Sequence, residues 1–149
     1  MATFAASLVT PERIVLQQEV AAVILRTDAG DATYLAGHTP LIGAVVPGLV
    51  RFQREDGTEE RVAAHGGFVH VKADGVSVLA PVAEMAQDID VERARRAQEV
   101  AEQAVAEATG RSAGTGDDDL AASRELAEAR AALVRAQVRL DVAASVPAV

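Results

Sequence analysis

Few residues of this chain have the types and spacing that catalysis needs. The sequence has no Gly-x-x-x-x-Gly-Lys-Ser/Thr phosphate loop, no Gly-x-Ser-x-Gly nucleophile turn and no convincing acid–base pair. His38, His65 and His70 are far apart, with no paired acid at ligand distance in the sequence, so we expect no metal site. The absence of cysteine excludes disulfides and cysteine-based metal sites. We therefore expect no independent enzyme and no required cofactor.

The residues that remain candidates for ligand binding lie in the second half of the chain. Asp90 and Arg93 stand three residues apart at the start of a predicted helix. Arg135 and Arg139 are four apart on a second predicted helix, so they share a face and suit phosphate oxygens. The alternative is a helix cap with a local ion pair, worth ~0.3–1 kcal/mol, beside a solvated flank. The residues alone leave both interpretations open.

Short strands are predicted for residues 1–86. The apolar run Val20–Leu25 is typical of a strand buried on both faces. Asp56-Gly57 and Asp74-Gly75 each lie between apolar segments, which is the pattern of a hairpin turn. With few aromatic residues, the core must be aliphatic. Strands so short and closely spaced favour an antiparallel β-sandwich or barrel.

After Pro81 the composition becomes that of helices. Asp88–Ala108 contains no Gly or Pro and is rich in strong helix formers. A polar break at 110–119 precedes a second predicted helix at about 120–144. In both helices apolar residues recur at alternating spacings of three and four: Ala94, Ala97, Ala101, Ala104 and Ala108, then Ala122, Leu126, Ala129, Leu133, Ala136 and Leu140. These seams predict an antiparallel two-helix coiled coil over residues 87–149, only marginally stable alone because alanine buries little area.

The charge balance argues against several kinds of partner. Fourteen basic and 22 acidic residues give a formal net charge of -8, which disfavours nucleic acid and anionic lipid surfaces. The N-terminus does not resemble a signal peptide, and no stretch approaches the ~18 apolar residues of a membrane span. We expect a soluble, cytoplasmic protein with no direct membrane insertion, which meets a membrane only through a partner.

Six segments, in order along the chain, resemble the epsilon subunit family of bacterial F-type ATP synthases. The most recognisable is an acidic turn leading into Gly37-His38-Thr39-Pro40-Leu41. The matching segments are residues 8–13, 30–41, 46–52, 65–69, 78–80 and 89–94. Together they extend through nearly the whole chain with the family's spacing and order.

The resemblance implies a ten-stranded β-sandwich and a helical hairpin at the foot of the rotating central stalk. Its implied partners are the gamma subunit, the membrane c-ring and the catalytic alpha and beta subunits, on the cytoplasmic face of the plasma membrane. Catalysis belongs to other subunits, and the helical tail inhibits ATP hydrolysis. Two alternatives stay open: a structural stalk coupler with a passive hairpin, and an unrelated β-sandwich interaction module.

The resemblance also implies a regulatory ATP site. Residues 89–94 fit the Ile/Leu-Asp-x-x-Arg-Ala motif that binds ATP in some bacterial members, with Arg93 at the phosphates and Ile89 at the adenine. Val100 departs from the pattern, because it stands where a nucleotide-binding relative carries an arginine. The expected site residues are Glu84, Ile89, Asp90, Arg93, Ala94, Arg135 and Arg139.

The segment from Asp28 to Leu41 is the candidate for rotor contact. We expect its polar turn to project toward the membrane ring, with Asp31 and His38 nearest. The expected contact residues are Asp28, Asp31, His38, Pro40 and Leu41. The alternative is an ordinary loop in which Gly37 and Pro40 only direct the backbone.

Overall fold

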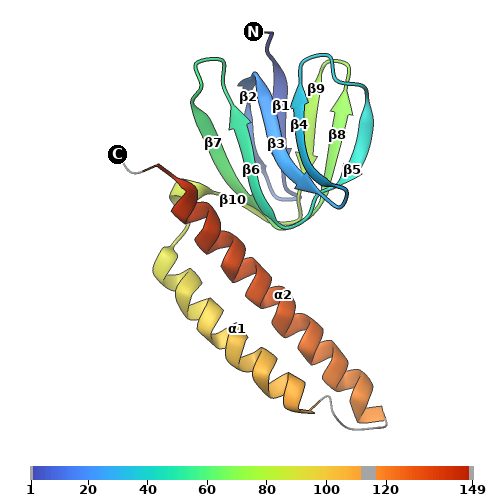
Figure 1. Cartoon of the computed structure of the whole chain (residues 1–149), viewed down its shortest axis with the longest axis vertical. Helices are drawn as coiled ribbons and strands as arrows, with labels where there is room; N and C mark the ends of the chain where they lie inside the picture. Colours follow the sequence, from blue (N-terminus) through green and yellow to red (C-terminus); the bar gives the residue numbers. More distant parts are fainter. Residues whose placement is uncertain (1, 112–116, 148–149) are drawn as a thin grey trace. The chain divides into compact units, whose positions relative to one another are not determined.

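The computed structural model describes residues 2–111 and 117–147 (Figure 1). Ten strands come first in the described chain: β1 (Phe4–Val9), β2 (Ile14–Val20), β3 (Ala22–Thr27), β4 (Gly30–Leu35), β5 (Leu41–Ala44), β6 (Gly48–Gln53), β7 (Glu59–Ala64), β8 (Phe68–Lys72), β9 (Gly75–Leu79) and β10 (Ala83–Met85). A short 3₁₀ turn η1 (Ala86–Asp88) leads to the helices α1 (Val91–Arg111) and α2 (Asp117–Ser145).

The strands form two five-stranded sheets, ordered β2-β1-β9-β8-β5 and β10-β7-β6-β3-β4. This confirms the predicted ten-stranded sandwich followed by two helices. The hairpins predicted at Asp56-Gly57 and Asp74-Gly75 are β6–β7 and β8–β9. The sandwich is not wholly antiparallel, however, since β1 pairs in parallel with β9. The β1–β2 and β8–β9 hairpins meet through these two strands, which run in the same direction.

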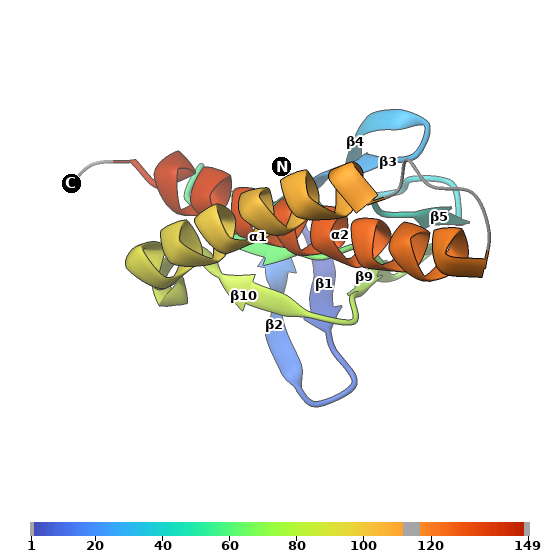
Figure 2. The ribbon, with the colours of Figure 1, turned by 90° about the horizontal axis from the view of Figure 1, so that it is seen from below.

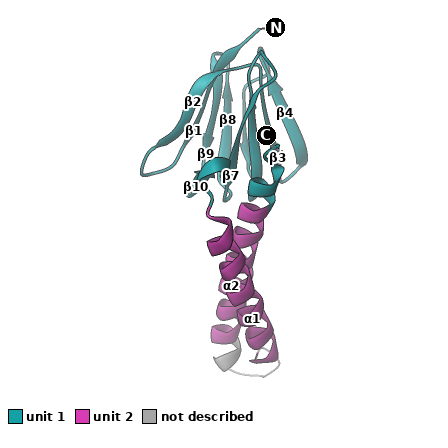
Figure 3. Ribbon diagram, turned by 90° about the vertical axis from the view of Figure 1, so that its left-hand side faces the viewer, with its two compact units in different colours: residues 1–89, 141–149 teal, residues 90–140 magenta. Residues whose placement is uncertain are grey.

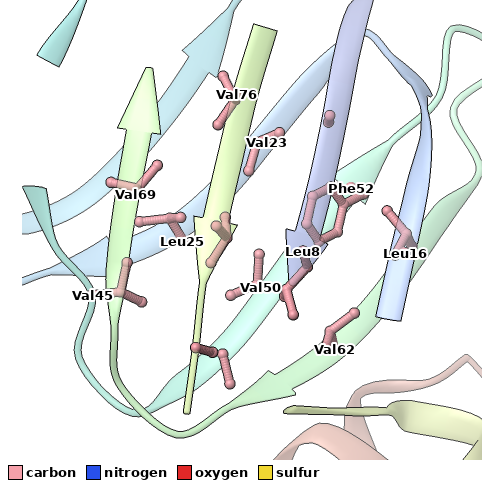
Figure 4. Close-up of a cluster of buried hydrophobic side chains, with 14 of the residues drawn as sticks. Leu8, Leu16, Val23, Leu25, Val45, Val50, Phe52, Val62, Val69 and Val76 are labelled. Atoms are coloured by element: carbon pink, nitrogen blue, oxygen red, sulfur yellow. The ribbon is translucent and has the colours of Figure 1, made fainter. Parts of the chain in front are cut away.

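The core between the sheets is aliphatic, as predicted, apart from two aromatic residues. Phe52 is fully buried at its centre, and Tyr34 is also buried. Figure 4 shows Leu8, Val50 and Val62 among the side chains that gather around Phe52. The inward positions alternate with outward ones along each strand, which is the two-residue period of a sandwich.

The apolar run Val20–Leu25 is only partly one strand: Ala22–Leu25 lie in β3, as predicted, whereas Val20 and Ala21 do not. β2 ends at Val20 in one sheet, and β3 begins at Ala22 in the other. Between them the backbone amide of Ala21 donates to the carbonyl of Gln53 over 2.7 Å. A chain that crosses between two packed layers is buried on all sides, as a central strand is, and its composition is therefore the same.

The chain divides into two compact units, residues 1–89 with 141–149, and residues 90–140 (Figure 3). In the second unit α1 and α2 lie side by side (Figures 1 and 2). The predicted seams are only partly right, since Ala97 is exposed and the leucines of α2 are half-buried. The deeply buried seam positions are Ala94, Ala101 and Ala108 on α1, and Ala122, Ala129 and Ala136 on α2. Facing alanines leave the larger side chains of α2 at the margin of the interface.

Candidate functional site

A row of apolar side chains crosses the outer face of the sheet β2-β1-β9-β8-β5. The strand register places Ala44 opposite Phe68, Phe68 opposite Leu79, Leu79 opposite Val9, and Val9 opposite Ile14. We call these five residues the apolar row. Phe68, Leu79 and Ile14 are 57%, 47% and 59% exposed. Side chains directly opposite on neighbouring strands share a face, so the row is one continuous surface.

The apolar row exists because the strands alternate between the core and the solvent. On β8, Val69 and Val71 point into the core, so Phe68 must point outward. Gly67, just before it, has φ +115°, and a Cβ there would overlap the carbonyl oxygen of Leu79. Only glycine lets β8 begin this close to β9. Large exposed apolar patches on soluble proteins mark interaction sites.

The turn between β3 and β4 lies at the same end of the sandwich as the apolar row. The amide of Asp28 donates to the carbonyl of Ala44 over 3.3 Å, and Thr27 forms a bridge with Val45. Asp28 and Asp31 are both exposed. The carboxylate of Asp31 lies 3.6 Å from Nε of Arg26, whose side chain is also exposed. An acidic turn therefore borders the apolar row.

His38 and Pro40 lie at the other end of the same sandwich. Figure 1 shows the β3–β4 turn and the β4–β5 loop at opposite ends of β4. Six residues of strand span ~20 Å, so the structure does not bring Asp31 and His38 together. Nδ1 of His38 donates to the carbonyl of Thr39 over 2.8 Å, and its ring meets that of Tyr34 edge-on at 5.1 Å. Burial raises the pKa of the Tyr34 hydroxyl.

Pro40 and Leu41 continue from that loop into β5. Pro40 is exposed, whereas Leu41 is half-buried and packs against the core. Leu41 is therefore a packing residue at the start of the strand that ends in Ala44. Of the five predicted contact residues, Asp28 and Asp31 border the apolar row.

Asp90 caps the start of α1. Its Oδ1 accepts a hydrogen bond from the backbone amide of Arg93 over 3.0 Å, and its carbonyl accepts from the amide of Ala94 over 3.0 Å. This is the geometry of a helix N-cap. The Arg93 side chain is exposed, while Ala94 is buried in the seam. The carboxylate of Asp90 thus holds the backbone of Arg93 and leaves the guanidinium in solvent.

Arg135 lies along a groove of about 430 Å³ between α1 and α2. The floor is made of alanines, and charged residues surround it. The groove is lined by Ala104, Glu107, Ala108, Arg111, Glu125, Glu128, Ala129, Ala132 and Arg135.

The remaining predicted ATP residues are Glu84, Ile89 and Arg139. Glu84 lies on β10 opposite Ala63 and is half-buried. Ile89 is buried after η1, and Arg139 is half-buried on α2, one turn beyond Arg135. ATP binding by these residues stays a prediction.

Within residues 2–111 and 117–147, no group of three or more His, Cys, Asp and Glu residues is placed to hold a metal ion. In the same part of the chain, neither helix has an apolar stretch long enough to cross a membrane.

Sequence reasoning missed the apolar row. The sequence predicts the segment containing Phe68 as one arm of a hairpin and as a match to the family, but not as part of a surface. The alternation of Phe68, His70 and Lys72 with two valines could have placed Phe68 outward. The order of the strands could not be read in this way, and only that order aligns Phe68 with Leu79, Val9 and Ile14.

Comparison with known proteins gives the same two-part division of the chain. The family model of the ATP synthase delta/epsilon chain β-sandwich domain matches residues 3–86, and that of the long α-helix domain matches residues 87–144. The ATP synthase epsilon chain of Shouchella clausii is 41% identical over 143 residues, covering 96% of each chain. That of Moorella thermoacetica is 40% identical over 146 residues, covering 98% of this chain and 100% of the relative.

A solved structure shows the same fold. A chain of the Euglena gracilis mitochondrial ATP synthase aligns with a TM-score of 0.72 and 25% identity, covering 97% of this chain and 82% of that one. A β-sandwich with a C-terminal helical hairpin thus defines a class of rotary ATP synthase subunits. The chain belongs to the ATP synthase delta/epsilon chain family.

Proposed function

We propose that this chain is the epsilon subunit of a bacterial ATP synthase and joins the central stalk by docking its apolar row on the gamma subunit. The observation that carries this proposal is the row itself, three large side chains about half exposed across five strands. Fully burying a side chain of this size is worth ~1.5–3 kcal/mol relative to exposure. A surface of this kind is stable in water only when a partner covers it or when it stays small.

The acidic turn beside the row is the proposed contact with the membrane c-ring. Asp28 and Asp31 are exposed at the same end of the sandwich as the row. Their charge suits polar or basic groups on the partner, and a solvent-exposed contact of this kind sets orientation more than affinity. In this proposal the subunit lies at the cytoplasmic face of the plasma membrane through the complex, and catalysis belongs to other subunits.

The helical tail, residues 87–149, is the proposed brake on ATP hydrolysis. Its interface is built on alanines, while Leu126, Leu133 and Leu140 are only half-buried. Such a hairpin is weakly held and can offer its leucines to the catalytic alpha and beta subunits when it opens. The proposed regulatory ATP is bound by Arg93 on α1 and by Arg135 and Arg139 on α2.

The docking surface is tested by assembly. Phe68→Glu and Leu35→Glu each place a charge at an exposed apolar position, 57% and 55% exposed, but on opposite sheets. We expect Phe68→Glu to prevent incorporation into a complex of alpha, beta and gamma subunits, and Leu35→Glu to leave it intact. Incorporation of both variants at the wild-type level would contradict docking through the row. If the wild-type chain is incorporated but the complex hydrolyses ATP as fast as the complex without it, the result would favour a structural coupler with a passive tail.

A further inference from the structure

The C-terminal end of α2 has no cation of its own. The carbonyl groups of a last helical turn have no partners within the helix and carry the negative end of its dipole. The last turn of α2 contains no basic residue. The hydroxyl of Ser145 donates to the carbonyl of Val142 over 2.6 Å, which satisfies one of these groups. The others need a donor from elsewhere.

Arg61 on β7 supplies that donor. Its Nη1 donates a hydrogen bond to the carbonyl oxygen of Ser145. Both residues belong to the same compact unit, residues 1–89 with 141–149. The Arg61 side chain is only 21% exposed, so solvent screens this contact less than a surface ion pair. A charged donor at helix carbonyls is among the stronger hydrogen bonds in proteins.

Glu59 and Arg51 hold Arg61 in place. Oε2 of Glu59 lies 2.9 Å from Nη2 of Arg61, and its Oε1 lies 3.4 Å from Nη1 of Arg51. Glu59 is 15% exposed, so its charge is compensated by these two arginines. Glu59 therefore bridges Arg51 and Arg61, and Arg61 in turn donates to the carbonyl of Ser145.

We propose that Arg61, oriented by Glu59, is a latch that fixes the end of α2 on the sandwich and limits release of the helical tail. The last residues of the tail then leave the sandwich only by breaking a charged hydrogen bond and exposing helix carbonyls. This inference rests on the proposed function only in what the released tail does. The latch itself is a property of the isolated chain.

Hydrogen exchange of the full-length isolated chain tests the latch directly. We expect the backbone amides of residues 141–145 to exchange about tenfold faster in Arg61→Ala than in wild type. Arg26→Ala is the matched control, because it removes an exposed arginine from the same sheet. It should leave these amides unchanged. Equal exchange in wild type and Arg61→Ala would overturn the proposal.

A second variant keeps the test valid if Arg61→Ala does not fold. Arg61→Met retains the aliphatic stem but has no N–H to donate to the carbonyl of Ser145, and the same acceleration is expected. The ATP hydrolysis rate of the assembled synthase then distinguishes the latch from the brake. Faster exchange with a lowered ATP hydrolysis rate supports both. Faster exchange with an unchanged rate supports the latch and contradicts the brake.

Discussion

The backbone amide of Asp28 donates to the carbonyl of Ala44, 3.3 Å away, and thereby joins the acidic β3–β4 turn to the apolar row. A polar turn and an apolar surface that are tied through the backbone move as one body. The two binding surfaces therefore lie at one end of the sandwich. One partner can cover the apolar row there, and another can contact the acidic turn.

Neutralising the acidic turn should alter coupling without altering stability. Asp31→Asn removes an exposed ion pair at 3.6 Å from Arg26, which contributes less than ~1 kcal/mol. We expect unchanged urea unfolding of the free chain and a lower rate of proton-driven ATP synthesis in the complex, with a larger effect at low salt. His38→Ala, at the other end of β4, should show no such salt dependence. The same salt-dependent loss in both variants would mean that the turn has no special role.

Gly67 should tolerate no side chain. Gly67→Ala meets the carbonyl oxygen of Leu79 and has φ +115°, so we expect a loss of at least ~3 kcal/mol in the free energy of unfolding. Gly57→Ala is the control, because it also has positive φ, +84°, but opens into free space. It should cost only ~1–2 kcal/mol. Equal costs in urea unfolding would show that the strands separate to admit the methyl group.

Asp90 should act on α1 as a cap rather than as a charge. Asp90→Ala removes the acceptor for the Arg93 amide and should cost ~0.5–2 kcal/mol of helix stability. Asp90→Asn keeps an acceptor and should cost much less. Thermal melting followed by circular dichroism measures both. If Asp90→Asn melts like Asp90→Ala, the negative charge and not the cap is what stabilises the helix.

Asp56 should titrate at unusually low pH. In the β6–β7 turn, the hydroxyl of Thr58 donates to its Oδ1 over 2.6 Å and the amide of Thr58 over 2.9 Å. These bonds, the hydroxyl first, lower the pKa of Asp56 below its ordinary value. The stability they contribute is therefore present above the unfolded-state pKa and is lost as pH falls through the folded one. Carboxyl titration by NMR should show Thr58→Ala shifting this pKa upward. No shift would remove Thr58 as the cause.

The fold was largely predictable because its local signals agree. Asp56-Gly57 and Asp74-Gly75 marked two hairpins, and the change of period after Pro81 marked the helices. The parallel pairing of β1 with β9 was not predictable, since turn residues report only which neighbouring strands pair. The same limit hid the crossing at Ala21, whose buried environment resembles that of a strand.

The candidate site was less predictable, because it depends on where strands begin and end. Asp31 and His38 are seven residues apart in the sequence, and the extended conformation of β4 places them at opposite ends of the sandwich. The apolar row comes from five strands whose alignment is a tertiary property.

Site-specific cross-linking in the assembled synthase tests the central claim most directly. The chain contains no cysteine, so Leu79→Cys and Leu35→Cys each provide a single position for a thiol-reactive photo-cross-linker. Both leucines are about half exposed, one in the apolar row and one on the outer face of the other sheet. Docking through the apolar row predicts efficient cross-linking to the gamma subunit from position 79 and little from position 35. Cross-linking to gamma from position 35 and none from position 79 would contradict it.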